Sequence, residues 1–173
     1  MSPYIKTITL TQVTPCLAEP GKVIVTGQPS RPLDEALPYL AALPNVIGFN
    51  PEALTLTFRR PRGFMTLYPS RVSITQVQDA EEGLELFAIL TEAINATWEN
   101  RAALKPVRTR KKPPGHLDIY ALLPQTNCKQ CDEATCLAFA VALITGKRIL
   151  DECTPLQTES TYEERKTTLE AML

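Results

Sequence analysis

The chain has 173 residues, of which 44% are hydrophobic and 21% are charged, and its formal net charge at pH 7 is −1. A chain of this length can hold one medium-sized domain, or a standard domain beside a small module. No window approaches about 18 uninterrupted apolar residues, and the N-terminus lacks the basic and apolar segments of a signal peptide. We therefore expect a cytoplasmic protein with no membrane span.

The first hundred residues are predicted to contain five strands and two helices. Alternating, β-branched patterns predict strands at residues 5–13, 22–26, 52–59, 64–68 and 71–77. Apolar residues at helical spacing predict a helix at 32–43, which Pro38 should shorten or kink, and another from Asp79 to about Asn100. This order predicts an α+β fold, in which an antiparallel sheet is covered on one face by helices.

Part of this domain resembles a known fold. Between Phe64 and Ala93, two short strands and a Pro-Ser turn precede a helix that opens on Asp-Ala-Glu-Glu, and this segment resembles half of the TATA-binding-protein fold. The resemblance implies a fold and no function. DNA binding requires clustered Lys and Arg, whereas residues 1–100 carry seven basic and ten acidic side chains. We do not expect nucleic acid as a partner.

Basic charge is concentrated in one short stretch. Residues 101–112 carry six Lys and Arg and no acidic residue, and the stretch 101–116 also contains three prolines and a glycine, a composition typical of a linker. We predict an α+β domain of unknown role at 1–100, a basic Pro-rich linker at 101–116 and a cysteine-containing domain at 117–173. Contact of the basic run with an acidic partner or nucleic acid is the alternative to a solvated tether.

Four of the five cysteines form a pattern, Cys128-x2-Cys131-x4-Cys136-x16-Cys153. In a reducing cytosol such a group is more typical of a metal site than of disulfides. A cubane iron-sulfur cluster needs one thiolate per iron, so four cysteines match four irons. Residues 137–150 are predicted to form a helix whose positive N-terminal end faces the anionic cluster, and Gly146 would let the chain turn back to Cys153.

Alternatives stay open for these and other candidate residues. Four cysteines also suit tetrahedral zinc, although zinc sites more often pair two Cys-x2-Cys knuckles. Cys16, the fifth cysteine, is interpreted as a buried structural thiol. His116 is the only histidine and has no catalytic partner in the sequence, so it supports no assignment of a general base. No catalytic residue is predicted.

The cysteine segment as a whole resembles a known domain. The matching elements are Leu123-Pro124, Thr126-Asn127-Cys128, Cys131, Thr135-Cys136, Leu137-Ala138-Phe139-Ala140, Gly146 and Cys153. They are similar to the small iron-sulfur domain of the large subunit of corrinoid/iron-sulfur proteins and of the B subunit of Rnf electron-transport complexes. The resemblance covers about residues 117–173 and implies a [4Fe-4S] cluster on the four cysteines. Lys129-Gln130 and Asp132-Glu133 depart from the family pattern and remove no ligand.

The expected function is that of an iron-sulfur protein which transfers electrons, or serves as a redox accessory, with a redox partner protein. The resemblance implies corrinoid-linked, anaerobic one-carbon metabolism as a setting and a corrinoid protein as a candidate partner. The alternative is a non-redox sensor or interaction scaffold, in which a cluster or zinc mainly supplies folding free energy. An enzyme is the least favoured hypothesis, because four cysteines on four irons leave no open iron.

Overall fold

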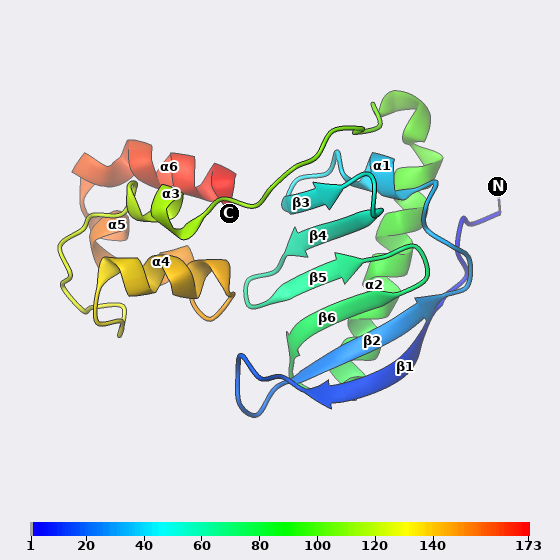
Figure 1. The fold of residues 1–173 in the computed structure, drawn as a ribbon, viewed down its shortest axis with the longest axis horizontal. Coiled ribbons are helices and arrows are strands. Elements are labelled where there is room, and N and C mark those ends of the chain that lie inside the picture. The colour runs from blue at the N-terminus through cyan, green and yellow to red at the C-terminus, as the bar shows by residue number, and fades with distance from the viewer. Residues whose placement is uncertain (1) are drawn as a thin grey trace. The chain divides into compact units, whose positions relative to one another are not determined.

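The computed structural model describes residues 2–173 (Figure 1). The chain divides into two compact units, Met1–Lys112 and Pro113–Leu173, and each unit has its own hydrophobic core. None of the helices found in residues 2–173 is long and apolar enough to cross a membrane.

The first unit is built on one six-stranded antiparallel sheet (Figure 1). Its strands are β1 (Ile8–Pro15), β2 (Val23–Pro29), β3 (Val46–Asn50), β4 (Thr55–Arg59), β5 (Phe64–Leu67) and β6 (Val72–Val77). Their order across the sheet is β1-β2-β6-β5-β4-β3. The pairing of β2 with β6 therefore joins the β1-β2 hairpin to the run of neighbouring strands β3 to β6.

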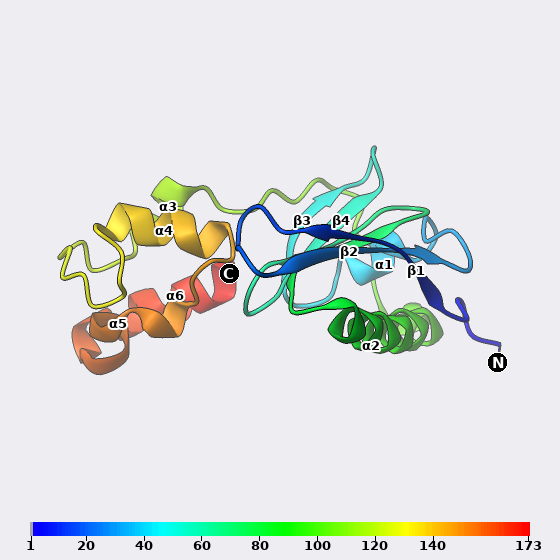
Figure 2. The same cartoon turned by 90° about the horizontal axis from the view of Figure 1, so that it is seen from below.

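Helix α2 (Ala80–Glu99) covers one face of this sheet, as Figure 2 shows. Phe87 and Ile94 of α2 are buried in the same core as Ile74 of β6, because alternate strand residues point to the helix side. The short helix α1 (Leu37–Leu40) contacts α2. The predicted α+β class, with an antiparallel N-terminal sheet and helices, is confirmed.

Two details of the secondary structure predicted for the first unit are wrong. Strand β3 was not expected, because its five residues include Gly48 and are flanked by turn-forming prolines and asparagines. Its pairing with β4 holds it in the sheet. The helix expected at 32–43 is α-helical over only four residues. Pro38 lies in the first turn of this short helix, where proline is tolerated. A helix that began at residue 32 would place Pro38 in its interior, where the proline ring would clash with the preceding turn.

The basic stretch predicted as a tether is held against the first unit up to Lys112. A 3-10 helix, Arg101–Ala103, directly follows α2, and the Val107 N–H donates to the carbonyl of Pro38 at 2.9 Å. Lys111 forms an antiparallel bridge with Phe49 of β3. Side chains of this stretch also contact the first unit, since Val107 packs against its core and the Arg101 guanidinium lies 4.3 Å from the centre of the Trp98 ring.

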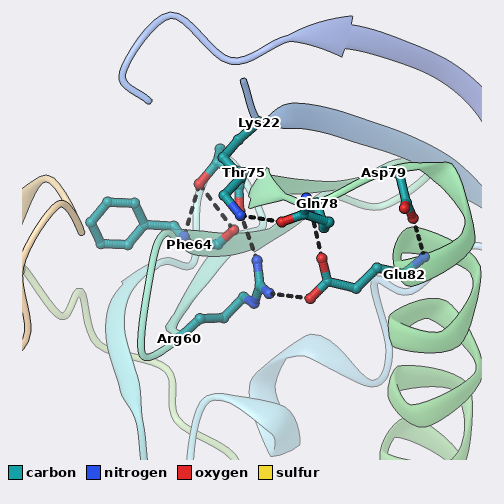
Figure 3. A network of polar contacts seen from close by, with 7 residues as sticks. All are labelled: Lys22, Arg60, Phe64, Thr75, Gln78, Asp79 and Glu82. Carbon is teal, nitrogen blue, oxygen red and sulfur yellow. Dashed lines mark hydrogen bonds and ion pairs between the residues drawn. The ribbon is translucent and has the colours of Figure 1, made fainter. Parts of the chain in front are cut away.

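A polar network fixes the start of α2 next to the β6 end (Figure 3). Asp79 caps the helix by accepting a 2.9 Å hydrogen bond from the Glu82 N–H, and the Glu82 carboxylate accepts one from the Gln78 N–H at 2.5 Å. Arg60 lies 3.7 Å from the same carboxylate and donates to the Thr75 carbonyl at 2.7 Å. Burial lowers the pKa of Arg60, and the neighbouring Glu82 opposes that shift. The network therefore links β6 and the turn between β4 and β5 to the first turn of the helix.

Loss of the α2 cap should weaken the first unit. In Asp79→Ala the Glu82 N–H loses its acceptor, so the free energy of unfolding should fall by about 1 kcal/mol. Urea unfolding followed by the fluorescence of Trp98, the only tryptophan, measures this change. Glu92→Ala, at an exposed position on the same helix, should change it by less than about 0.5 kcal/mol. Equal effects of the two variants would contradict the role of the cap.

Gly83 allows α2 to approach β2 closely. A Cβ atom at this position would lie 2.7 Å from Cγ1 and 3.0 Å from Cγ2 of Val25. Gly83→Ala should therefore destabilise the unit by about 1 kcal/mol, because overpacking of about 1–3 kcal/mol exceeds the helix propensity gained. In the double variant with Val25→Ala the loss should be smaller than the sum of the single losses. Additive losses in urea unfolding would exclude this contact as the cause.

The second unit is helical. It contains α3 (His116–Tyr120), α4 (Cys136–Ile144), α5 (Thr154–Thr158) and α6 (Glu163–Met172), with 3-10 helices at Leu150–Glu152 and Ser160–Tyr162. Its core is drawn from all four α-helices and one cysteine: Ile119, Leu123, Phe139, Ala140, Leu143, Cys153, Leu156 and Leu169. The helix predicted at 137–150 is shorter than expected, because α4 ends at Ile144.

Candidate metal centre

The four clustered cysteines line one cavity of the second unit. Cys128 and Cys131 lie in the loop between α3 and α4, Cys136 is the first residue of α4, and Cys153 immediately precedes α5. The cavity is also lined by Leu123, Pro124, Thr126, Asn127, Lys129, Glu133, Thr135, Phe139, Thr154 and Pro155. The structure thus brings together side chains separated by a complete helix. Cys16 belongs to the first unit and is buried there.

The start of α4 is held at the cavity by two polar side chains. Thr135 caps the helix, because its hydroxyl accepts from the Ala138 N–H at 3.0 Å. Asn127 contacts Cys136 twice: its Oδ1 accepts from the Cys136 N–H at 2.8 Å, and its own N–H donates to the Cys136 Sγ at 3.4 Å. The sulfur is therefore oriented by a neighbour of Cys128, at the positive end of a helix.

The loop that carries the first two cysteines contains several left-handed backbone conformations. Gln125, Asn127, Lys129 and Asp132 all have φ between 51° and 63°. Such values are costly for residues with a Cβ atom, and Asn and Asp tolerate them best. Alternation of left-handed and ordinary residues folds a loop tightly and directs its N–H groups inward, an arrangement that favours anions. The departures of Lys129 and Asp132 from the family pattern fall at these positions.

Cys153 is the most enclosed of the four thiols. Its exposed fraction is 6%, whereas Cys128 is exposed and Cys131 and Cys136 are intermediate. Burial raises the pKa of Cys153, the Leu156 backbone lowers it, and the nearby Cys131 adds to the rise. The negative charge of a Cys153 thiolate is therefore unfavourable here without a cation to offset it.

The chain returns to the site by a sharp turn after α4. Gly146 has φ of 74°, and the N–H groups of Gly146 and Lys147 bond to the carbonyls of Leu143 and Ala142 at 3.2 and 2.9 Å. This is the glycine-dependent helix ending that the sequence predicted. The next residues include Arg148, whose ion pairs with Glu133 and Glu152 the sequence did not predict.

The donor set fits a group held by several thiolates. Four sulfur atoms around one cavity would supply one ligand to each iron of a four-iron cluster, and the helix N-terminus beside them would favour the negative charge of such a group. Across residues 2–173 no three His, Cys, Asp or Glu side chains are gathered tightly enough to hold a single ion. Residues that line a cavity can lie further apart than the ligands of a single ion. The four cysteines can therefore share one cavity without being close enough together to hold one ion. His116 begins α3 and does not line the cavity.

Comparison with known proteins identifies this segment. Residues 123–155 match the family model described as "Putative Fe-S cluster". This range contains all four clustered cysteines and the whole of α4. No solved structure matches the chain, so the likeness of the first unit to half of the TATA-binding-protein fold stays a prediction.

The curated relatives match the same part of the chain. The acetyl-CoA decarbonylase/synthase complex subunit gamma of Methanothermobacter thermautotrophicus is 52% identical over 40 residues, covering 23% of this chain and 9% of that protein. Subunit gamma 2 of Methanosarcina thermophila is 44% identical over 57 residues, covering 33% of this chain and 12% of that protein. The large subunit of the corrinoid/iron-sulfur protein of Moorella thermoacetica is 54% identical over 37 residues, covering 21% of this chain and 8% of that protein.

The matched segment spans about a tenth of the length of these relatives. The predicted resemblance to the large subunit of corrinoid/iron-sulfur proteins is confirmed. Residues 123–155 of the second unit therefore match an iron-sulfur cluster family model, and the segment is similar to parts of the decarbonylase/synthase gamma subunits and of the corrinoid/iron-sulfur protein large subunit.

Proposed function

We propose that the second unit binds one [4Fe-4S] cluster through Cys128, Cys131, Cys136 and Cys153, and that the protein transfers electrons. The arrangement of four thiols around one cavity, at the N-terminus of α4, carries this proposal. Such a cluster, when bound, accepts and releases one electron at a time. The relatives named for an iron-sulfur protein support iron over zinc as the metal.

The exposure of the ligands supports a role in electron transfer. Cys128, the first of the four cysteines along the chain, is exposed, whereas Cys153, the last, is buried. One corner of the site therefore lies at the surface of this unit, where another protein can approach, while Cys153 is enclosed by the apolar core that includes Phe139. Solvent exposure and hydrogen bonds to sulfur, such as that from Asn127, both set the reduction potential.

The proposed setting is anaerobic one-carbon metabolism. It comes from the names of the relatives, which are subunits of the acetyl-CoA decarbonylase/synthase complex and of a corrinoid/iron-sulfur protein. We infer that a redox partner protein, with a corrinoid protein as the first candidate, exchanges electrons with this chain. The α+β domain at the N-terminus is proposed to bind that partner, since it lies outside the matched segment and has its own core.

Anaerobic purification followed by metal and sulfide analysis tests the proposal. About four irons and four sulfides per chain are expected, with no EPR signal as isolated and an S = 1/2 signal after dithionite reduction. One zinc without sulfide would exclude the cluster. Reversible reduction in a potential titration, and oxidation of the reduced protein by an added corrinoid protein, would support electron transfer in the proposed setting.

A structural role for the cluster is the second candidate. Cys153 belongs to the hydrophobic core of the second unit, so a bound metal group would join the segment before α5 to the remaining helices. Metal binding would then mainly supply folding free energy. A cluster that is destroyed on reduction, instead of cycling between two states, would favour this scaffold or sensor function.

A further inference from the structure

We propose that Arg148 is a positioning residue that closes the cluster site around its fourth ligand. The proposal rests on the function proposed above, since it concerns the same site. Arg148 lies between the helix that starts at Cys136 and the segment that ends at Cys153. It forms ion pairs with one residue on each side of the site, Glu133 and Glu152, and we call these three residues the arginine clamp.

The contacts of the arginine clamp are specific. The Arg148 Nε donates to Glu133 Oε1 at 3.0 Å, and Nη1 donates to Glu152 Oε1 at 3.3 Å. The other oxygen of Glu152 accepts from the Ile149 N–H at 2.8 Å, which orients that carboxylate. All three side chains are only about one-quarter exposed. Partial burial reduces screening by water, so these ion pairs are stronger than those between fully exposed side chains.

The two glutamates of the arginine clamp lie beside different cysteines of the site. Glu133 lies between Cys131 and Cys136 and lines the cavity, while Glu152 directly precedes Cys153. The backbone connects these two regions only through α4 and the turn at Gly146. The clamp provides a second, shorter connection, and it holds the buried thiol near the other three. The first three proposed ligands are close in sequence, so the fourth is the one that needs this support.

Arginine suits this position better than lysine. Its planar guanidinium has several N–H donors in a fixed geometry and can bond to two carboxylates at once, whereas a lysine ammonium acts as a point charge. Its positive charge also lies near a site that the thiolates make negative. Removal of the charge should therefore lower the reduction potential of a bound cluster, and removal of the Glu133 charge should raise it.

The test compares iron release from the cluster-loaded full chain and its variants under anaerobic conditions. Arg148→Gln should release iron to an added chelator at least about fivefold faster than the wild type, the ratio expected from loss of two partly exposed ion pairs. Glu133→Gln should also release iron faster, and Arg148→Lys should be intermediate. Arg165→Gln is the matched control, because Arg165 is exposed on α6 and faces Tyr162 instead of the site.

Reduction potentials separate this role from general loss of stability. Arg148→Gln should lower the midpoint potential and Glu133→Gln should raise it, although both release iron faster, while Arg148→Lys should keep it near the wild-type value. A general loss of packing gives no such opposite shifts. If Arg148→Gln does not fold, Glu133→Gln and Arg148→Lys still supply the comparison. Wild-type release rates in the clamp variants would overturn the proposal.

Failure of the proposed function has a different signature. If the wild-type protein contains zinc and no sulfide, the cluster assignment fails. The clamp is then judged by zinc release, which the same variants should accelerate in the same order if the arginine clamp positions Cys153.

Discussion

Cys153→Ala is expected to lose the intact cluster. The substitution removes the buried one of the four proposed ligands, so iron should fall well below about four per chain, and the S = 1/2 signal of the reduced protein should disappear or change to that of a smaller cluster. Iron and sulfide analysis of anaerobically purified protein, with EPR before and after dithionite, measures both effects. Few other single substitutions in this chain should alter its chemistry as much.

Cys16→Ala is the matched control for this prediction. Cys16 is as buried as Cys153, at 6% exposed, but it belongs to the first unit. Its loss should leave iron and sulfide unchanged and should slightly reduce the stability of the first unit. Retention of iron in Cys153→Ala together with loss of iron in Cys16→Ala would overturn the assignment of ligands.

Removal of the metal group is expected to unfold the second unit while the first unit stays folded. The second unit has a small core that includes Cys153 itself, and structural metal groups contribute on the order of 10 kcal/mol to such small domains. Loss of helical circular dichroism on removal of iron measures the change. Trp98 packs against Tyr4 with ring centroids 4.5 Å apart, so its fluorescence reports on the first unit.

The fluorescence of Trp98 and the helical circular dichroism should therefore respond differently to removal of iron. After iron removal, the denaturant midpoint seen by Trp98 should match that of the loaded protein, and the helical signal of the second unit should lack a cooperative transition. A second unit that melts at the same temperature with and without iron would show that its helices do not need the metal. Asp79→Ala, which acts on the first unit, should shift the Trp98 transition and leave iron content unchanged.

Much of the fold could be predicted from local pattern. The long helix α2 has a strong N-cap and a clear apolar face, and both features are encoded within the helix. Strand β3 was missed because its local sequence is a weak strand signal. β3 is held by the neighbouring β4 on one side and by Lys111 on the other, and only the partner Lys111 is distant in sequence.

The candidate site shows the same division. The spacing of the cysteines, the start of α4 at Cys136 and the turn at Gly146 follow from short-range rules for ligands and helix ends. The contacts of Asn127 with Cys136 and the arginine clamp could not be deduced this way. Nine residues separate the first pair and fifteen separate Glu133 from Arg148, and the fold alone decides that these side chains meet.

Because the four proposed ligands differ in exposure, we expect loss of a bound cluster to start at the exposed ligand. Oxidants and chelators that arrive from solvent reach the corner at Cys128 first, while Cys153 is shielded by the core. Damage should therefore begin at one iron, and the remaining three cysteines should still hold an incomplete cluster for a time.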